Sequence, residues 1–159
     1  MKTDVYTLHT DQTVLEALQT FAERGISGAP IVNRDGALVG FLSDGDVMRY
    51  LSAAHPSSKL IYSFAIGADD DLEQAMSELA DLNVMKLATH DVVTINASES
   101  IAEAVAALSD AHLKKVPVVS GEEGRMVGIV SRSAINRLAI GNYISQRVEL
   151  LQAAGAQTS

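Results

Sequence analysis

Side chains able to do covalent chemistry are scarce in this 159-residue sequence. Ser43 could act as a nucleophile only beside a base, and no histidine stands at a sequence distance that suggests one. The four histidines show no metal-ligand spacing, cysteine is absent, and no glycine-rich phosphate loop or nucleophile elbow is present. We therefore expect no catalytic residue, no metal ligand and no enzymatic activity.

Two charged groups could still hold a ligand. Lys114 and Lys115, the only adjacent basic pair, could neutralise a phosphate, although a lone pair of this kind is more often a solvated strand end. The run from Asp69 to Asp71 could hold Mg²⁺. We favour a helix start whose carboxylates cap free amides, because the segment does not supply the other oxygen ligands that such a cation needs.

The overall charge limits the partners. The sequence has 12 Lys and Arg against 20 Asp and Glu, a net charge of −8, which does not steer a protein onto nucleic acid or anionic lipid. No apolar window reaches the roughly 18 residues of a membrane span, and the residues after Met1 do not resemble a signal peptide. The lack of cysteine fits a reducing compartment, so we expect a cytoplasmic protein.

The sequence contains two similar halves, which must position any site. Residues 5–8 resemble residues 92–95, and Pro30-Ile-Val resembles Pro117-Val-Val at the same offset. After one inserted residue, Val39-Gly-Phe-Leu-Ser43 resembles Val127-Gly-Ile-Val-Ser131. Internal repetition of this kind predicts two copies of one structural unit.

Each copy predicts the same order of elements. A short strand leads to a Ser/Thr-x-x-Glu capping box, which begins at Thr13 in the first repeat and at Ser100 in the second. The first helix is expected to end at Gly25. Strands 29–32 and 38–42 follow, joined by a turn at Asp35-Gly36, and a second helix comes after them. We expect an α/β (α+β) fold of two pseudo-twofold-related β-α-β-β-α repeats packed through their sheets.

The repeats also suggest where the chain divides. The first repeat is expected to cover residues 1–55 and the second residues 83–145. Residues 56–82 include apolar positions at helical spacing and are expected to form a helical connecting segment. Residues 146–159 are expected to be the end of the last helix and a tail.

One pattern occurs near the end of both repeats: Gly-h-h-Ser/Thr-x-x-Asp-h-h-Arg, with h an apolar residue, after a proline-containing strand. The first repeat reads Gly40-Phe-Leu-Ser43-Asp-Gly-Asp46-Val-Met-Arg49. The second reads Gly128-Ile-Val-Ser131-Arg-Ser-Ala134-Ile-Asn-Arg137, with alanine in place of aspartate. The pattern resembles the signature of cystathionine-β-synthase (CBS) domains, and its repetition resembles a tandem pair, or Bateman module, in a stand-alone prokaryotic-like protein.

The resemblance implies two clefts, each built from both repeats. In the first, the helix start after Ser43 would attract phosphate, Asp46 would hold a ribose, the lysine pair would neutralise phosphate and apolar walls would sandwich an adenine. The ligand-binding residues expected on this basis are Leu42, Ser43, Asp46, Asp91, Val92, Val93, Lys114, Lys115, Val116 and Pro117.

The second cleft lacks both the ribose-binding carboxylate and the phosphate-binding lysines. It would take Ser131 and Ala134 from the second repeat and residues 4–6 and 27–29 from the first, so it has neither the carboxylate nor the lysines. We therefore expect one competent site per chain. Arg24 or Arg132 could still supply a positive charge there.

Two residues of the first cleft have structural alternatives. Asp46 could simply cap the helix that follows Ser43, but Asp44 is better placed to do so, and we favour ribose binding by Asp46. Arg49 could form a salt bridge or touch the ligand, and the sequence leaves both open.

The resemblance implies a regulatory module that binds an adenine nucleotide such as AMP, ADP or ATP, with S-adenosylmethionine or NAD as further possibilities, and that signals by conformational change. No other cofactor is expected. It also implies a homodimer and an effector protein that the sequence does not identify. A ligand-free dimerisation or interaction module and a Mg²⁺-linked regulatory domain remain as alternatives.

Overall fold

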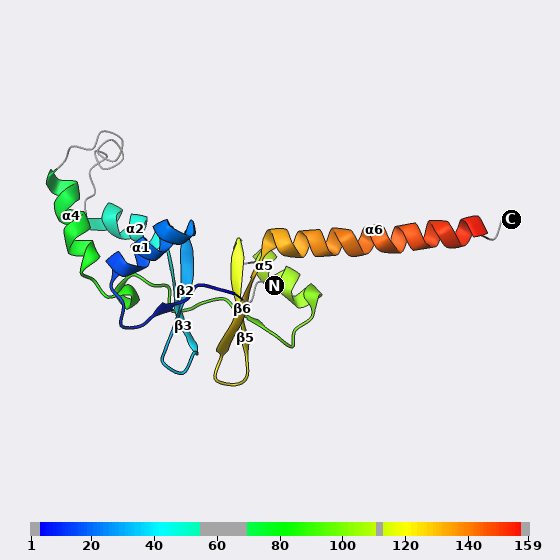
Figure 1. The fold of residues 1–159 in the computed structure, drawn as a ribbon, viewed down its shortest axis with the longest axis horizontal. Coiled ribbons are helices and arrows are strands. Elements are labelled where there is room, and N and C mark those ends of the chain that lie inside the picture. The colour runs from blue at the N-terminus through cyan, green and yellow to red at the C-terminus, as the bar shows by residue number, and fades with distance from the viewer. Residues whose placement is uncertain (1–3, 55–69, 111–112, 157–159) are drawn as a thin grey trace. The chain divides into compact units, whose positions relative to one another are not determined.

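The computed structural model describes residues 4–54, 70–110 and 113–156. These residues form two compact units. The first-repeat unit contains residues 6–54, 70–92 and 122–126, and the second-repeat unit contains residues 4–5, 93–110, 113–121 and 127–156. Each unit has a three-stranded sheet and a core of its own, which Figure 1 shows with the element labels used below.

The first-repeat unit has the predicted order of elements. Strand β1 is paired parallel to β2, and β2 is paired antiparallel to β3. The helices are α1, α2, α4 and a short 3₁₀ helix, η1. The bounds are β1 Leu8–His9, α1 Val14–Arg24, β2 Gly28–Val32, β3 Leu38–Ser43, α2 Asp44–Ala54, α4 Asp70–Ala80 and η1 Val84–Lys86.

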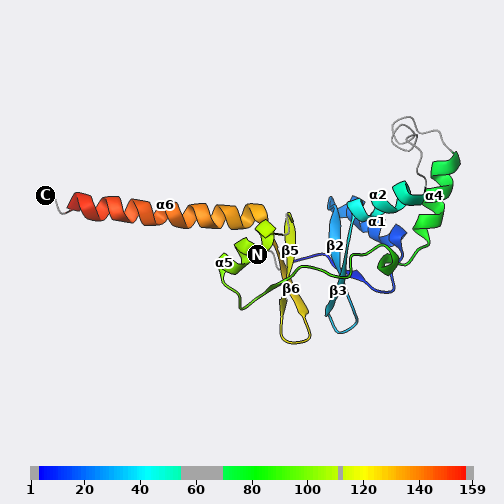
Figure 2. The same ribbon diagram turned by 180° about the vertical axis from the view of Figure 1, so that it is seen from behind.

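The second-repeat unit repeats this order. Strand β4 is paired parallel to β5, and the sheet has the order β4-β5-β6. The bounds are β4 Ile95–Asn96, α5 Ile101–Asp110, β5 Lys115–Ser120, β6 Arg125–Ser131 and α6 Arg132–Ala156. Helix α6 continues well past α5 and the sheet of its own unit (Figure 2). The predicted α/β fold class and the two β-α-β-β-α repeats are confirmed.

The predicted signals at the ends of α1 are confirmed. Glu16 N donates to Thr13 Oγ1 at 3.3 Å, and Thr13 N donates to Glu16 Oε2 at 2.8 Å, so both free amides are satisfied by the capping box. Gly25 ends the helix with a φ of 60°, a left-handed conformation that glycine adopts without a Cβ penalty. These contacts fix the entry to and exit from α1.

Two apolar clusters hold the first-repeat unit together. In one, Ala17 and Phe21 of α1 pack with Ile31 of β2 and Leu42 of β3. In the other, α1 and α2 pack against α4, where Leu79 is fully buried. The helical spacing predicted for the connecting segment is thus confirmed from Asp70 onward, while residues 55–69 lie outside the described residues.

The segment that follows α4 packs on the sheet of the first-repeat unit. Val84 is fully buried and belongs to the same cluster as Leu42. Phe41 N donates to Thr89 O and Thr89 N donates to Phe41 O, both at 2.9 Å, so this segment adds an antiparallel bridge at the open edge of β3. The residues that open the second repeat in the sequence therefore complete the structure of the first.

In the part of the chain that the structure describes, no helix combines the length and the apolar character needed to span a membrane.

Candidate functional site

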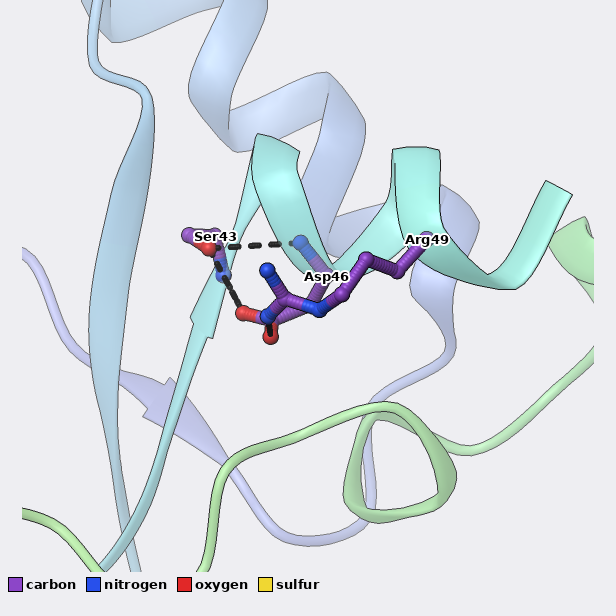
Figure 3. Close-up of polar contacts among 3 residues, drawn as sticks. All are labelled: Ser43, Asp46 and Arg49. Atoms are coloured by element: carbon purple, nitrogen blue, oxygen red, sulfur yellow. Dashed lines mark hydrogen bonds and ion pairs between the residues drawn. The ribbon is translucent and has the colours of Figure 1, made fainter. Parts of the chain in front are cut away.

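The candidate site begins where β3 passes directly into α2. Ser43 is the last residue of β3, and Asp46 lies in the first turn of the helix. The Ser43 amide donates to Asp46 Oδ2 at 2.8 Å and the Ser43 hydroxyl donates to the same oxygen at 2.6 Å. The Asp46 amide in turn donates to Ser43 Oγ at 3.4 Å. The two residues thus form a reciprocal capping box with aspartate in the usual place of glutamate (Figure 3).

Arg49 completes this group from the next turn of α2. Its guanidinium donates to Asp46 Oδ1 and forms an ion pair with it (Figure 3). The Asp46 side chain is 6% exposed, whereas that of Arg49 is 72% exposed. Among the described residues, Asp46 is the one charged side chain that is buried. A buried carboxylate is costly unless it is paired and hydrogen-bonded, and here both conditions are met.

The prediction that Asp44 is the better placed cap is wrong. Asp46 makes the capping contacts, while Asp44 is exposed and its amide donates to Ser27 O at 2.9 Å. The reason is positional: Ser43 itself is the residue before the helix, so Asp46 falls at the third helical position, from which a side chain reaches back to the Ser43 amide. Arg49 forms the salt bridge that the sequence left open. Ribose binding by Asp46 stays a prediction.

The other residues expected at the site are divided between the two units. Asp91 and Val92 follow the Thr89 bridge in the first-repeat unit, and Asp91 is exposed. Val93, Lys114, Lys115, Val116 and Pro117 belong to the second-repeat unit. The structure therefore brings together Ser43 and Asp46, with Leu42 next to them in β3.

Three of the expected wall residues are buried in the core of their own unit. Leu42 and Val116 are fully buried and Pro117 nearly so. Leu42 and Val116 pack in the apolar clusters of their own units, so a ligand could reach only backbone atoms of these three buried residues.

The lysine pair is exposed at the start of β5. Lys114 O accepts a hydrogen bond from Arg132 N at 2.9 Å, which holds this strand start against the first residue of α6. Phosphate binding by the lysine pair stays a prediction.

The equivalent helix start in the second-repeat unit has the cap but not the carboxylate. Ala134 N donates to Ser131 Oγ at 3.2 Å, and Ser131 Oγ lies 3.1 Å from Ser133 Oγ. A methyl group stands where Asp46 stands in the first repeat. The two helix starts are therefore similar, but only the one in the first repeat has a carboxylate that can accept hydrogen bonds.

Gly28 occupies the position that Lys115 has in the second repeat. The structure explains why this residue is glycine, which the sequence alone did not. A Cβ at this position would lie 2.9 Å from Leu42 O and 3.1 Å from Ser43 Cα, both backbone atoms. No side chain fits there unless the β2–β3 pair shifts. The first repeat cannot carry a lysine at this point without distorting the strand that leads to Ser43.

The two arginines that could have supplied charge to a second site are engaged within their own units. The Arg24 guanidinium stacks 4.5 Å from the centroid of the Tyr6 ring and donates to the Tyr6 hydroxyl at 3.1 Å. Arg132 donates to Leu108 O at 3.2 Å, at the end of α5. The stacking of Arg24 on Tyr6 was not predicted, because nothing local in the sequence links residues 18 positions apart.

The described residues include no group of three or more histidine, cysteine, aspartate or glutamate side chains that could hold a metal ion. Asp69 lies outside the described residues, as do the side chains of Asp70 and Asp71.

Comparison with known proteins identifies the repeats. Residues 1–53 and 84–141 match the family model of the CBS domain. The chain belongs to the CBS-domain family. Its two matches make it a tandem CBS pair, and the Ser43–Asp46 group lies in the first CBS domain.

Curated relatives agree with this assignment at modest identity. The chain is 26% identical over 135 residues to the uncharacterized protein MJ1426 of Methanocaldococcus jannaschii, covering 79% of this chain and 80% of that protein. In two other relatives from the same organism the chain spans only 24% and 40% of the protein's length.

Solved structures share the fold. CBSX2 from Arabidopsis thaliana in complex with AMP superposes with a TM-score of 0.64 at 21% identity, covering 88% of this chain and 90% of that one. The CBS domain pair of protein MJ0100, in complex with 5′-methylthioadenosine and S-adenosyl-L-methionine, has a TM-score of 0.60 at 23% identity, with coverages of 87% and 90%.

Proposed function

We propose that this CBS pair is a non-catalytic regulatory module that binds an adenine nucleotide at the Ser43–Asp46 helix start and signals by a change in conformation. The sequence predicts that Lys114 and Lys115 neutralise its phosphate. A ligand that binds one arrangement of the repeats more tightly than another shifts the population toward that arrangement, which is all that such a sensor requires. The effector protein would read that arrangement.

The observation that carries the proposal is the buried carboxylate of Asp46 at a helix N-terminus. It is ionisable, shielded from solvent and held in one orientation by Ser43, which suits recognition of neutral hydroxyl donors. The ligands named for the two structural neighbours, AMP and 5′-methylthioadenosine with S-adenosyl-L-methionine, share an adenosine group. A ribose is therefore the chemical feature that Asp46 would recognise here.

The lysine pair favours phosphate-bearing ligands. Two exposed ammonium groups attract a phosphate and repel the sulfonium of S-adenosylmethionine. We therefore expect AMP, ADP or ATP to bind more tightly than S-adenosylmethionine, with an affinity that falls as salt is added.

Calorimetric titration of AMP, ATP and S-adenosylmethionine tests the proposal, with Asp46→Asn as the diagnostic variant. Losing charged hydrogen bonds of about 1.5–3 kcal/mol would weaken nucleotide binding roughly ten- to hundredfold. Asp44→Asn is the matched control, because it removes the same charge from the same helix start without touching Ser43. Thermal melts of both variants check that they fold.

Equal nucleotide affinity in wild type and Asp46→Asn would show that Asp46 does not contribute to nucleotide binding. Equal losses in Asp44→Asn and Asp46→Asn would reduce the effect to general electrostatics at the helix start. No heat with any of the three compounds would contradict nucleotide binding itself.

A second candidate function is an interaction module, and α6 favours it. Its side chains include strongly exposed apolar ones, with Ile140 60%, Tyr143 66% and Leu150 65% exposed. Exposed apolar residues gathered on one element are typical of surfaces that contact a partner. A homodimer in sedimentation velocity without heat from any adenosine compound would favour this function over nucleotide sensing.

A further inference from the structure

The Asp46 carboxylate has little hydrogen-bonding capacity left for a ligand. A carboxylate offers about four lone-pair sites, two on each oxygen. Oδ2 already accepts from the amide of Ser43 at 2.8 Å and from its hydroxyl at 2.6 Å, which fills it. Oδ1 accepts from Arg49. One acceptor site on Oδ1 therefore remains, whereas a ribose presents two vicinal hydroxyl donors.

Accepting both hydroxyls requires one existing donor to leave, and the structure indicates which one. The Ser43 amide is a backbone group at a half-buried strand end, and losing its partner would leave a donor unsatisfied. The Ser43 hydroxyl is held between Asp46 Oδ2 and Asp46 N. The Arg49 side chain, 72% exposed, can return its guanidinium to water, and such exposed ion pairs are weak.

Gly45 places no side chain beside this pair. Gly45 lies between the partners in sequence, and a Cβ there would be 3.6 Å from Ser43 Oγ and 3.7 Å from an Arg49 guanidinium nitrogen. The guanidinium thus passes over a residue without a side chain to reach Asp46. If it swings outward, no side chain of Gly45 occupies the place that it leaves.

We infer that Arg49 sets the sugar specificity of the site by competing with the ribose for Asp46 Oδ1. This inference rests on the proposed nucleotide site. With Arg49 bound, Asp46 can accept a single hydroxyl, and a deoxyribose satisfies it as well as a ribose does. When Arg49 leaves, Asp46 accepts both hydroxyls, and ribose gains over deoxyribose. Arg49 is a positioning residue in this scheme, since it acts through Asp46.

The test compares adenosine with 2′-deoxyadenosine and 3′-deoxyadenosine, which lack phosphate and so exclude direct contacts between Arg49 and a phosphate. The variant is Arg49→Met, which keeps an unbranched apolar stem. Because an exposed ion pair is worth about 0.2–1 kcal/mol, its removal should raise adenosine affinity up to about fivefold. The affinities of both deoxynucleosides should stay close to those of the wild-type chain, so the preference for adenosine over the deoxynucleosides should increase.

Two controls separate this role from a general effect of charge or folding. Arg34→Met removes an exposed arginine from the β2–β3 turn, at the opposite end of β3 from Ser43, and should leave the ribose preference unchanged. Arg49→Lys keeps the charge and should stay close to wild type. In an Asp46→Asn background, Arg49→Met should no longer alter the preference, because the residue through which it acts is gone.

An unchanged ribose preference in Arg49→Met, or a weaker adenosine affinity, would overturn the inference while leaving the nucleotide site intact. A change of equal size in Arg34→Met would also overturn it. If the wild-type chain binds none of the three nucleosides and no nucleotide, the proposed function fails, and the inference fails with it.

Discussion

At the scale of single residues, Glu103 closes the capping box at the start of α5. Its carboxylate accepts from the Ser100 amide at 2.7 Å and from the Ser100 hydroxyl at 2.9 Å. These bonds favour the charged form, so the backbone bond first and the hydroxyl bond second hold the pKa of Glu103 below its ordinary value. The Glu103 side chain is exposed, so a substitution there removes these contacts without disturbing the core.

The lowered pKa of Glu103 predicts a pH dependence of stability. Because the pKa is lower in the folded than in the unfolded chain, the unfolded chain binds the proton more readily. The contribution is therefore complete above the ordinary pKa of a glutamate and is lost as the pH falls through the lowered value. In Glu103→Gln, acid-induced unfolding followed by circular dichroism should lose this part of its pH dependence.

Ser100→Ala serves as the partner control for Glu103. It removes the hydroxyl bond but keeps the stronger amide bond, so its pH dependence should lie between those of wild type and Glu103→Gln. If Glu103→Gln keeps the full acid sensitivity of the wild-type chain, the carboxylate is not held by Ser100 in solution.

At the scale of elements, Gly28 is the point where two strands leave no room for a side chain. In Gly28→Ala, a Cβ 2.9 Å from the Leu42 carbonyl oxygen must push backbone apart. Overpacking of this kind costs about 1–3 kcal/mol, and we expect chemical denaturation to show that loss. The strand that moves also carries Ser43, so nucleotide affinity should fall in the same variant.

Gly141→Ala is the matched control for Gly28→Ala. Gly141 lies within α6, where a Cβ would meet nothing within 4 Å. Alanine should stabilise this helix by up to about 1 kcal/mol, because glycine has the poorer helix propensity. Opposite signs in the two variants are the expected result, and a stable Gly28→Ala chain would show that β2 and β3 yield easily.

Much of the element order was predictable because its signals are local. A capping box and a glycine with positive φ fix α1 within a few residues of sequence, and Gly36, with a φ of 80°, fixes the turn between β2 and β3. The difference between Asp46 and Ala134 was also predictable, because aligning the two repeats is enough to reveal it.

The features that were not predicted depend on contacts between residues far apart in the sequence. The choice of Asp46 over Asp44 as the cap depends on where β3 ends, to within one residue, and patterns locate such ends only approximately. The packing of residues 84–89 on the first sheet depends on Val84 fitting beside Leu42, and no local signal reveals that. The close approach of β3 to Gly28 is likewise a property of the paired strands.

At the scale of the whole molecule, the chain has separate cores. One pair of clusters surrounds Leu42 and Leu79 in the first-repeat unit, and another cluster surrounds Val116 in the second-repeat unit. Ser43 and Asp46 lie in the first-repeat unit, whereas Lys114 and Lys115, which the sequence predicts to contact phosphate, lie in the second-repeat unit. A ligand stabilises the unit that holds it, so its effect on each unit can be measured separately.

Hydrogen exchange measured with and without AMP tests whether both units hold the nucleotide. At a concentration about 100 times Kd, binding stabilises the bound form by about 2.7 kcal/mol, which slows exchange through openings that release the ligand. We expect slower exchange in peptides that cover the start of α2 and, equally, the start of β5 near Lys114. Residues 142–150 of α6 provide the internal control, and their exchange should not change.

Two comparisons test the sequence-based prediction that Lys114 and Lys115 contact the phosphate. If this prediction holds, Lys114→Gln with Lys115→Gln weakens AMP binding and reduces protection at the start of α2 when AMP is kept at the wild-type concentration. Adenosine, which has no phosphate for the lysines to neutralise, should respond far less to the same pair of changes. Protection confined to α2 in the wild-type chain would instead mean that the first repeat binds the nucleotide alone, and that the lysines are a solvated strand end.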